Sequence, residues 1–177
     1  MPAGKIEHVE ELATAAAAKY VPGSRLGPLI SADQRKEVES FLEPGAGGAD
    51  AVTVTSPLEL PERGYYVSPT VISRVAPDSR LAQEEVFGPV LAVLAARSDE
   101  DAVALANDSI YGLGGAVWGP DEAALDVAGR LQTGQVDING GAFNPAAPFG
   151  GYKQSGIGRE IGEYGIADVL EIKAVQR

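Results

Sequence analysis

A regular alternation of short apolar runs and helical segments begins at Pro89 and constrains the fold more than any other feature. The continuous apolar run at 90–96, VLAVLAA, is typical of a strand buried on both faces. Two further runs, at 113–118 and 135–139, follow at intervals that a helix fills. Strands joined in this way form right-handed βαβ crossovers. The sequence therefore predicts an α/β fold with a parallel (βαβ) sheet and flanking helices.

Two helices are predicted between these strands. Ser98 suits the N-cap of a helix that runs through Ala106, and the acidic residues that follow it favour the positive end of a helix dipole. The second helix, 121–133, ends before Gly134. Its inward stripe is predicted to be Leu125, Ala128 and Leu131.

The first half of the chain is predicted to contain two further helices. Residues 5–20 place apolar side chains at helical spacing. Ser31 and Gln34 form a capping box at the start of the next helix, whose buried stripe is Val38, Phe41 and Leu42. The alternating segment 51–55 is predicted as a strand, and 64–75 is expected to be extended with a break at Pro69.

The composition excludes several classes of function. The chain has 177 residues, no cysteine, one histidine and a net charge of −11. Without cysteine there is no disulfide, no Cys-ligated metal site and no thiol nucleophile, and one histidine leaves no multi-His metal site. No basic stretch could neutralise a phosphate backbone, so no nucleic-acid partner is expected. The N-terminus lacks a signal-peptide layout and no apolar run could span a bilayer, which favours a cytoplasmic protein without a membrane partner.

The end of the chain differs from the rest. A glycine-dense segment, 140–165, is of a kind that is usually functional or packed tightly against a neighbour. Residues 151–177 are near neutral, and the alternating segment 169–175, VLEIKAV, resembles an edge strand able to pair with another chain. SGIGREIG at 155–162 is not a dinucleotide fingerprint, because Ile161 occupies the position of the last glycine.

Two groups of residues are candidates for binding. In QEEVFGPV, 83–90, Glu85 could bond a ribose diol and Phe87 could pack on a flat ring. Taken alone, the segment favours a solvated acidic loop with Phe87 packed in the core. Phe143 and Phe149 could wall a substrate channel or pack in the core. Asn139, at a strand end, occupies a ligand-binding position of α/β sheets or forms a turn.

In combination these segments resemble the NAD(P)-dependent aldehyde dehydrogenases. The likeness runs through GPLIS at 27–31, QEEVFGPVLAV at 83–93, TGQVDIN at 133–139 and PFGGYKQSGIGRE at 148–160, in the family's order. It implies that Glu85 binds the nicotinamide ribose, that Phe87 packs near the nicotinamide and that Gln34 lies near the cofactor ribose of NAD or NADP. It also implies that Phe143, Phe149 and Asn139 belong to the substrate tunnel of a small-molecule aldehyde.

The resemblance covers only about the last third of such an enzyme and lacks its nucleophilic cysteine and general-base glutamate. It implies a partial catalytic domain, 1–162, followed by an oligomerisation segment, 163–177, with no catalytic residue of its own. One hypothesis is a fragment that is inactive alone and needs a complementary N-terminal aldehyde dehydrogenase piece. The alternatives are a non-catalytic domain acting in self-association as a homo-oligomer or in protein interaction, and a gene remnant.

Overall fold

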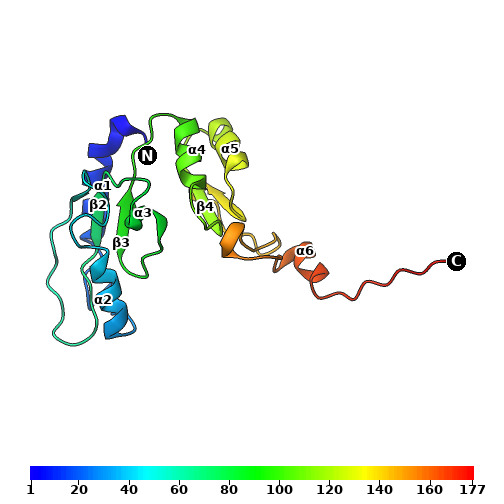
Figure 1. Ribbon diagram of the computed structural model, residues 1–177, viewed down its shortest axis with the longest axis horizontal. Helices are drawn as coiled ribbons and strands as arrows, with labels where there is room; N and C mark the ends of the chain where they lie inside the picture. Colours follow the sequence, from blue (N-terminus) through cyan, green and yellow to red (C-terminus); the bar gives the residue numbers. More distant parts are fainter. The chain divides into compact units, whose positions relative to one another are not determined.

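The computed structural model describes residues 1–177, and the chain divides into two compact units, Met1–Ser98 and Asp99–Arg177 (Figure 1). The first unit contains η1 (Ala3–Lys5), α1 (Ile6–Ala17), α2 (Ala32–Ser40), β1 (Val52–Thr53), β2 (Thr70–Ser73), α3 (Arg80–Gln83) and β3 (Val90–Val93). The second contains α4 (Asp99–Asn107), β4 (Gly114–Val117), α5 (Asp121–Arg130), β5 (Gln135–Ile138), η2 (Lys153–Ser155) and α6 (Gly162–Ala167). The predicted division at 162/163 stays a prediction, although α6 begins at that point.

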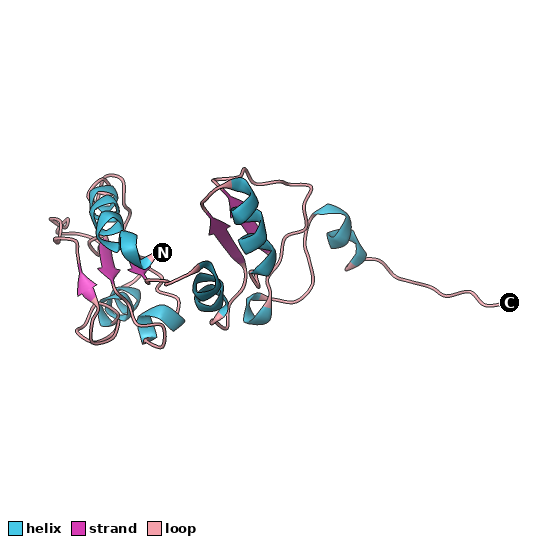
Figure 2. Cartoon of the chain, turned by 90° about the horizontal axis from the view of Figure 1, so that it is seen from above, coloured by secondary structure: helices cyan, strands magenta, loops and turns pink.

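The sheet of the first unit has the order β1-β2-β3. β1 is antiparallel to β2, and β2 is parallel to β3 with Ile72 opposite Ala92. Since side chains alternate along a strand, the sheet has two faces. Helix α1 lies over the face that carries Val71 and Leu91, and Phe41, just after α2, packs on the face that carries Ile72. Figure 2 shows these helices above and below the strands.

The core of the first unit forms where α2 and α3 meet the sheet. Its buried cluster consists of Phe41, Ile72, Val75 and Leu81. The predicted N-cap of α2 is confirmed, because the Ser31 hydroxyl accepts the Gln34 N–H at 3.0 Å. The predicted stripe is also confirmed, with Val38 and Phe41 buried and Leu42 partly buried. Burying these side chains supplies the main stabilisation of the unit.

The second unit is built on one crossover. β4 and β5 are parallel, with Ala116 opposite Asp137, and α5 joins them as predicted. The predicted parallel strands therefore divide between two sheets, since β3 pairs with β2 and β4 pairs with β5. The helix between β3 and β4 does not connect neighbouring strands of one sheet. An earlier segment, 70–73, already provides β3 with its parallel partner.

Burial in the second unit is slight. Ala124 is its one buried hydrophobic residue. The prediction that Leu125 faces inward was wrong, because this side chain is 63% exposed. The buried position is one residue earlier, so the helix presents a small alanine to the strands and turns its leucine outward. Helix α5 therefore contributes little apolar burial.

The glycine-dense segment is packed tightly against backbone. A Cβ on Gly134 would lie 1.6 Å from the Gly150 carbonyl oxygen, so only glycine permits this approach. The segment is tied nearby by the Tyr152 N–H, which donates to the Gly112 carbonyl at 2.7 Å. Residues 169–175 form no strand or β-bridge in the single chain, and the N–H groups of Val169 and Leu170 donate to carbonyls of α6. No helix has the length and apolar character needed to cross a membrane.

Candidate functional site

The five residues after α3, Glu84–Gly88, form what we call the 84–88 loop. Val86 packs against the core cluster, whereas Glu85 and Phe87 on either side of it are exposed. Phe87 is 66% exposed and is therefore not a core plug. The Glu85 carboxylate has no hydrogen-bond or ion-pair partner in the chain. The loop thus presents an acidic and an aromatic side chain to its surroundings while its central valine is held in place.

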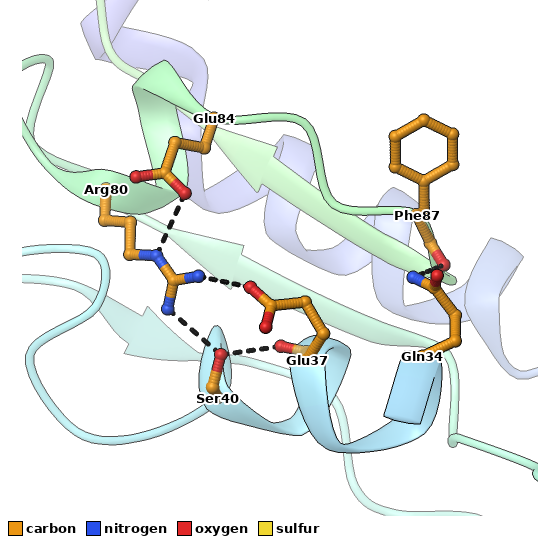
Figure 3. A network of polar contacts seen from close by, with 6 residues as sticks. All are labelled: Gln34, Glu37, Ser40, Arg80, Glu84 and Phe87. Atoms are coloured by element: carbon orange, nitrogen blue, oxygen red, sulfur yellow. Dashed lines mark hydrogen bonds and ion pairs between the residues drawn. The ribbon is translucent and has the colours of Figure 1, made fainter. Parts of the chain in front are cut away.

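Gln34 lies beside this loop. It occupies the first turn of α2, behind the Ser31 cap, and its side-chain Nε2 donates to the Phe87 carbonyl at 3.2 Å (Figure 3). The predicted capping box is therefore used in one direction only, since the glutamine amide bonds the loop. The structure brings Gln34 and Phe87 together, although 53 residues separate them.

Arg80 makes a second connection between α2 and the loop, and sequence reasoning missed it. Its Nε donates to Glu84 Oε2 at 3.1 Å, its Nη1 to Ser40 Oγ at 3.0 Å and its Nη2 to Glu37 Oε1 at 2.5 Å. The guanidinium carbon also lies 3.8 Å from the centre of the Phe41 ring. Hydrogen bonding to Glu84, opposed by desolvation and aided by Glu37, raises the pKa of Arg80 above its usual value. The i, i+4 spacing of Arg80 and Glu84 was the signal available in the sequence.

Close packing completes the attachment of the loop. A Cβ on Gly88 would lie 2.7 Å from a Val38 methyl group, so the end of the loop approaches α2 as only glycine allows. The Gly88 N–H donates to the Val86 carbonyl at 2.7 Å, and the Val90 N–H donates to the Gly88 carbonyl at 2.8 Å. These contacts give the loop a defined path into β3.

The tunnel candidates lie in the second unit. Asn139 has φ +52° directly after β5, and its side chain bonds both the N–H and the carbonyl of Gly119, at 3.0 and 2.9 Å, and Asp121 Oδ1 at 3.1 Å. The residue is thus a turn former whose amide fixes the β4–α5 loop. The next residue, Gly140, packs against the exposed ring of Trp118.

The two phenylalanines differ in their surroundings. Phe143 is 59% exposed in the loop after β5. Phe149 is half-buried, and its backbone pairs with Glu160, the two N–H···O distances being 2.8 and 2.6 Å. Phe149 also lines a pocket formed by the glycine-dense segment. No hydrogen bond joins Phe143 and Phe149, so their common role in a tunnel stays a prediction.

The serine hydroxyls have structural roles. Ser31 Oγ caps α2, and Ser155 Oγ accepts the Gly112 N–H at 2.9 Å. Neither hydroxyl has a base beside it that could activate it as a nucleophile. The single histidine, His8, lies 3.9 Å from Glu11 on an exposed helix face. These hydroxyls therefore have structural roles, and the imidazole lies at the surface.

The chain belongs to the aldehyde dehydrogenase family, whose profile, "Aldehyde dehydrogenase family", matches residues 5–175. It is 41% identical to a geranial dehydrogenase of Castellaniella defragrans, with 98% of this chain and 38% of that protein aligned. It is 49% identical to a betaine aldehyde dehydrogenase of Bacillus subtilis, with 85% of this chain and 32% of that protein aligned. The chain thus spans about a third of the length of these relatives.

Solved structures agree with the fold. An aldehyde dehydrogenase C variant of Pseudomonas syringae, solved with NAD+ and octanal, superposes with a TM-score of 0.89 at 41% identity and covers 98% of this chain and 38% of that one. An aldehyde dehydrogenase of Mycobacterium tuberculosis, solved with NAD+, gives 0.83 at 38% identity, covering 94% and 36%. The α/β fold is therefore that of part of an aldehyde dehydrogenase.

Proposed function

We propose that this chain supplies the nicotinamide-facing part of an NAD(P)-dependent aldehyde dehydrogenase. In this proposal Glu85 accepts hydrogen bonds from the ribose hydroxyls of NAD or NADP, Phe87 packs near the nicotinamide, and Gln34 lies near the ribose. The main support is the 84–88 loop, in which Glu85 and Phe87 are both exposed and Glu85 is unpaired, although the backbone between them is held. When bound, the cofactor accepts a hydride from the substrate.

The proposal assigns no catalytic residue to this chain. Aldehyde oxidation in the family needs a thiolate to attack the carbonyl and a base to hydrolyse the thioester. The chain has no cysteine, so we expect no turnover from it alone. We propose that a complementary aldehyde dehydrogenase piece supplies both groups. Phe143, Phe149 and Asn139 would contribute one side of the aldehyde's tunnel.

A chimera tests this function. The segment of the Bacillus subtilis betaine aldehyde dehydrogenase that aligns with this chain, at 49% identity, is replaced by the sequence of this chain. NAD(P)H absorbance is then followed with betaine aldehyde and with short aliphatic aldehydes. We expect turnover from the chimera and none from the chain alone. A folded chimera that shows no turnover with any of these aldehydes would contradict the proposal.

Variants of the chimera test the assigned residues. Glu85→Gln keeps the shape of the side chain but removes its charge, and should raise the KM for NAD+ by about tenfold, because hydrogen bonds to a charged group are worth about 1.5–3 kcal/mol. Glu59→Gln is the matched control, since Glu59 is exposed and outside the loop. Equal KM values for the two variants would remove Glu85 from the cofactor site.

A second candidate function is self-association without catalysis. The observation that favours it is the segment 169–175, whose apolar side chains are largely exposed, Ile172 at 91%. An unpaired extended segment of this kind can add to a sheet edge of another copy. Light scattering coupled to size exclusion tests it, and a monomer at every concentration would contradict it. A cytoplasmic location stays a prediction from the sequence.

A further inference from the structure

We propose that Arg80 is a positioning residue that fixes the 84–88 loop against α2, so that Glu85 and Phe87 face outward together. The role of Glu85 and Phe87 rests on the proposed function, whereas the positioning itself concerns this chain alone. Arg80 touches neither the exposed carboxylate nor the exposed ring. It acts through Glu84, which directly precedes Glu85.

Arg80 connects three side chains in two places of the first unit. One nitrogen holds Glu84 at the start of the loop, and the other two hold Glu37 and Ser40 near the end of α2 (Figure 3). Ser40 is itself oriented by a bond of 2.6 Å from its hydroxyl to the Glu37 carbonyl. All three guanidinium nitrogens therefore donate hydrogen bonds, and two of the three acceptors, on Glu37 and Ser40, belong to α2.

Gln34 holds the other side of the same loop. Its bond to the Phe87 carbonyl lies three residues beyond Glu84, and between these two attachments Val86 packs into the core. With Glu84 bonded to Arg80 and Val86 packed into the core, Glu85 and Phe87 on either side of Val86 are the side chains that the loop exposes. Loss of the Arg80 side chain leaves the first half of the loop held by Val86 and by the bond of the Glu84 N–H to the Arg80 carbonyl, at 3.0 Å.

The chemistry requires arginine. A planar guanidinium can bond several partners at fixed angles and stack on an aromatic ring at the same time, whereas an ammonium is a point charge. Arg80 does both, with Phe41 beneath it at 3.8 Å. Lysine would retain the charge opposite Glu84 and Glu37 but would lose the simultaneous bonds and the stacking.

Hydrogen exchange on the full chain tests the positioning. The amides of Gly88 and Val90 report on the loop, because each donates to a carbonyl within 86–88. Arg80→Met keeps the length and the apolar contact with Phe41, and should speed their exchange by about tenfold. Arg80→Lys should give an intermediate rate. The matched control is Arg35→Met, which removes the 2.7 Å Arg35–Glu39 pair within α2, outside the loop.

Equal exchange at Gly88 and Val90 in Arg80→Met and Arg35→Met would overturn the proposal. If Arg80→Met does not fold, Glu84→Gln decides, since it weakens only the loop side of the network and should speed exchange by about threefold. In the active chimera, Arg80→Met should raise the KM for NAD+ several-fold and change kcat by less than about twofold. An inactive chimera would count against the proposed function and leave the exchange result standing.

Discussion

The two compact units of this chain are stabilised in different ways. Met1–Ser98 buries large side chains between helices and a three-stranded sheet, with Phe41, Ile72 and Leu81 at the centre. In Asp99–Arg177 the one buried hydrophobic residue is an alanine, Ala124. This unit relies instead on close backbone contacts, such as that of Gly134 with Gly150. The first unit is stabilised mainly by its hydrophobic core, whereas the second depends on polar and backbone contacts.

The slight burial in the second unit agrees with the observation that the chain spans only part of the family fold. Relatives are more than twice as long, and the chain covers 38% of the geranial dehydrogenase. The second unit exposes many apolar side chains, among them Trp118, Leu125 and Ile166. Substitutions in the core of the first unit and at the polar contacts of the second test whether the two units differ in this way.

The largest effect is expected from Phe41→Ala in the first unit. The ring is buried at 2% exposure, and deletion of a buried phenylalanine costs about 3–5 kcal/mol. The free energy of unfolding, from urea titration followed by far-ultraviolet circular dichroism, checks it. Phe143→Ala is the control, because Phe143 is exposed. A similar loss of unfolding free energy in Phe41→Ala and Phe143→Ala would contradict this difference between the units.

Asn139→Asp should give the next largest effect, in the second unit. The change keeps the acceptor for the Gly119 N–H but places a carboxylate oxygen against the Gly119 carbonyl and Asp121, where the amide now donates. Losing these bonds should cost about 1–3 kcal/mol. Native-state hydrogen exchange of the β4 and β5 amides measures it.

Asn144→Asp provides the matched charge control for that experiment. The side-chain oxygen of Asn144 accepts the Ala146 N–H at 3.0 Å, and a carboxylate can do the same. We expect β4 and β5 to exchange at nearly the rates of the unaltered chain in Asn144→Asp. Faster exchange in both variants would mean that added negative charge, and not the Asn139 attachment, controls this unit.

Ser31→Ala should have a smaller effect, confined to the first unit. It removes the N-cap of α2, which costs about 1 kcal/mol. Urea titration measures the loss, and Ser24→Ala, in an exposed turn, serves as the control. No difference between the two variants would show that α2 is held by Phe41 and Val38 burial alone.

Leu125→Ala should have the smallest effect, although it removes as many atoms as a core substitution. Leu125 is 63% exposed, and substitution of a surface side chain changes stability by less than about 0.5 kcal/mol. Leu81→Ala is the buried counterpart and should cost about 2–5 kcal/mol. Thermal unfolding of the pair measures the contrast directly. A large loss of stability in Leu125→Ala would mean that Leu125 is buried, and would contradict the slight burial in the second unit.

Much of the fold could be predicted from local sequence. Ser31 has a hydroxyl at the start of an apolar stripe, and the structure confirms both the cap and the stripe. The α5 crossover also follows from spacing alone. The pairing of β3 with β2 could not be predicted, because strand partners are chosen by long-range packing and 64–75 was expected only to be extended. The outward orientation of Leu125 could not be predicted either, because helical periodicity does not show which face of the helix packs on the sheet.

The candidate site was predictable in its residues but not in its support. Glu85 and Phe87 lie in the segment 83–93, which resembles the aldehyde dehydrogenases, so the resemblance identified them as candidates. The bond from Gln34 to the Phe87 carbonyl spans 53 residues and involves backbone, which no residue pattern records. Arg80 was missed because only its i, i+4 partner is local, whereas Glu37 and Ser40 lie about 40 residues away.

The ring of Trp118, packed beside Gly140 in the second unit, has a spectroscopic consequence. It is the single tryptophan of the chain and is 73% exposed. The intrinsic fluorescence of the protein should therefore have the long emission wavelength of a hydrated indole. Any molecule that covers this face, whether a complementary piece or a second copy, should shift the emission toward the blue. The chain thus carries an optical reporter of its own assembly, readable without a label.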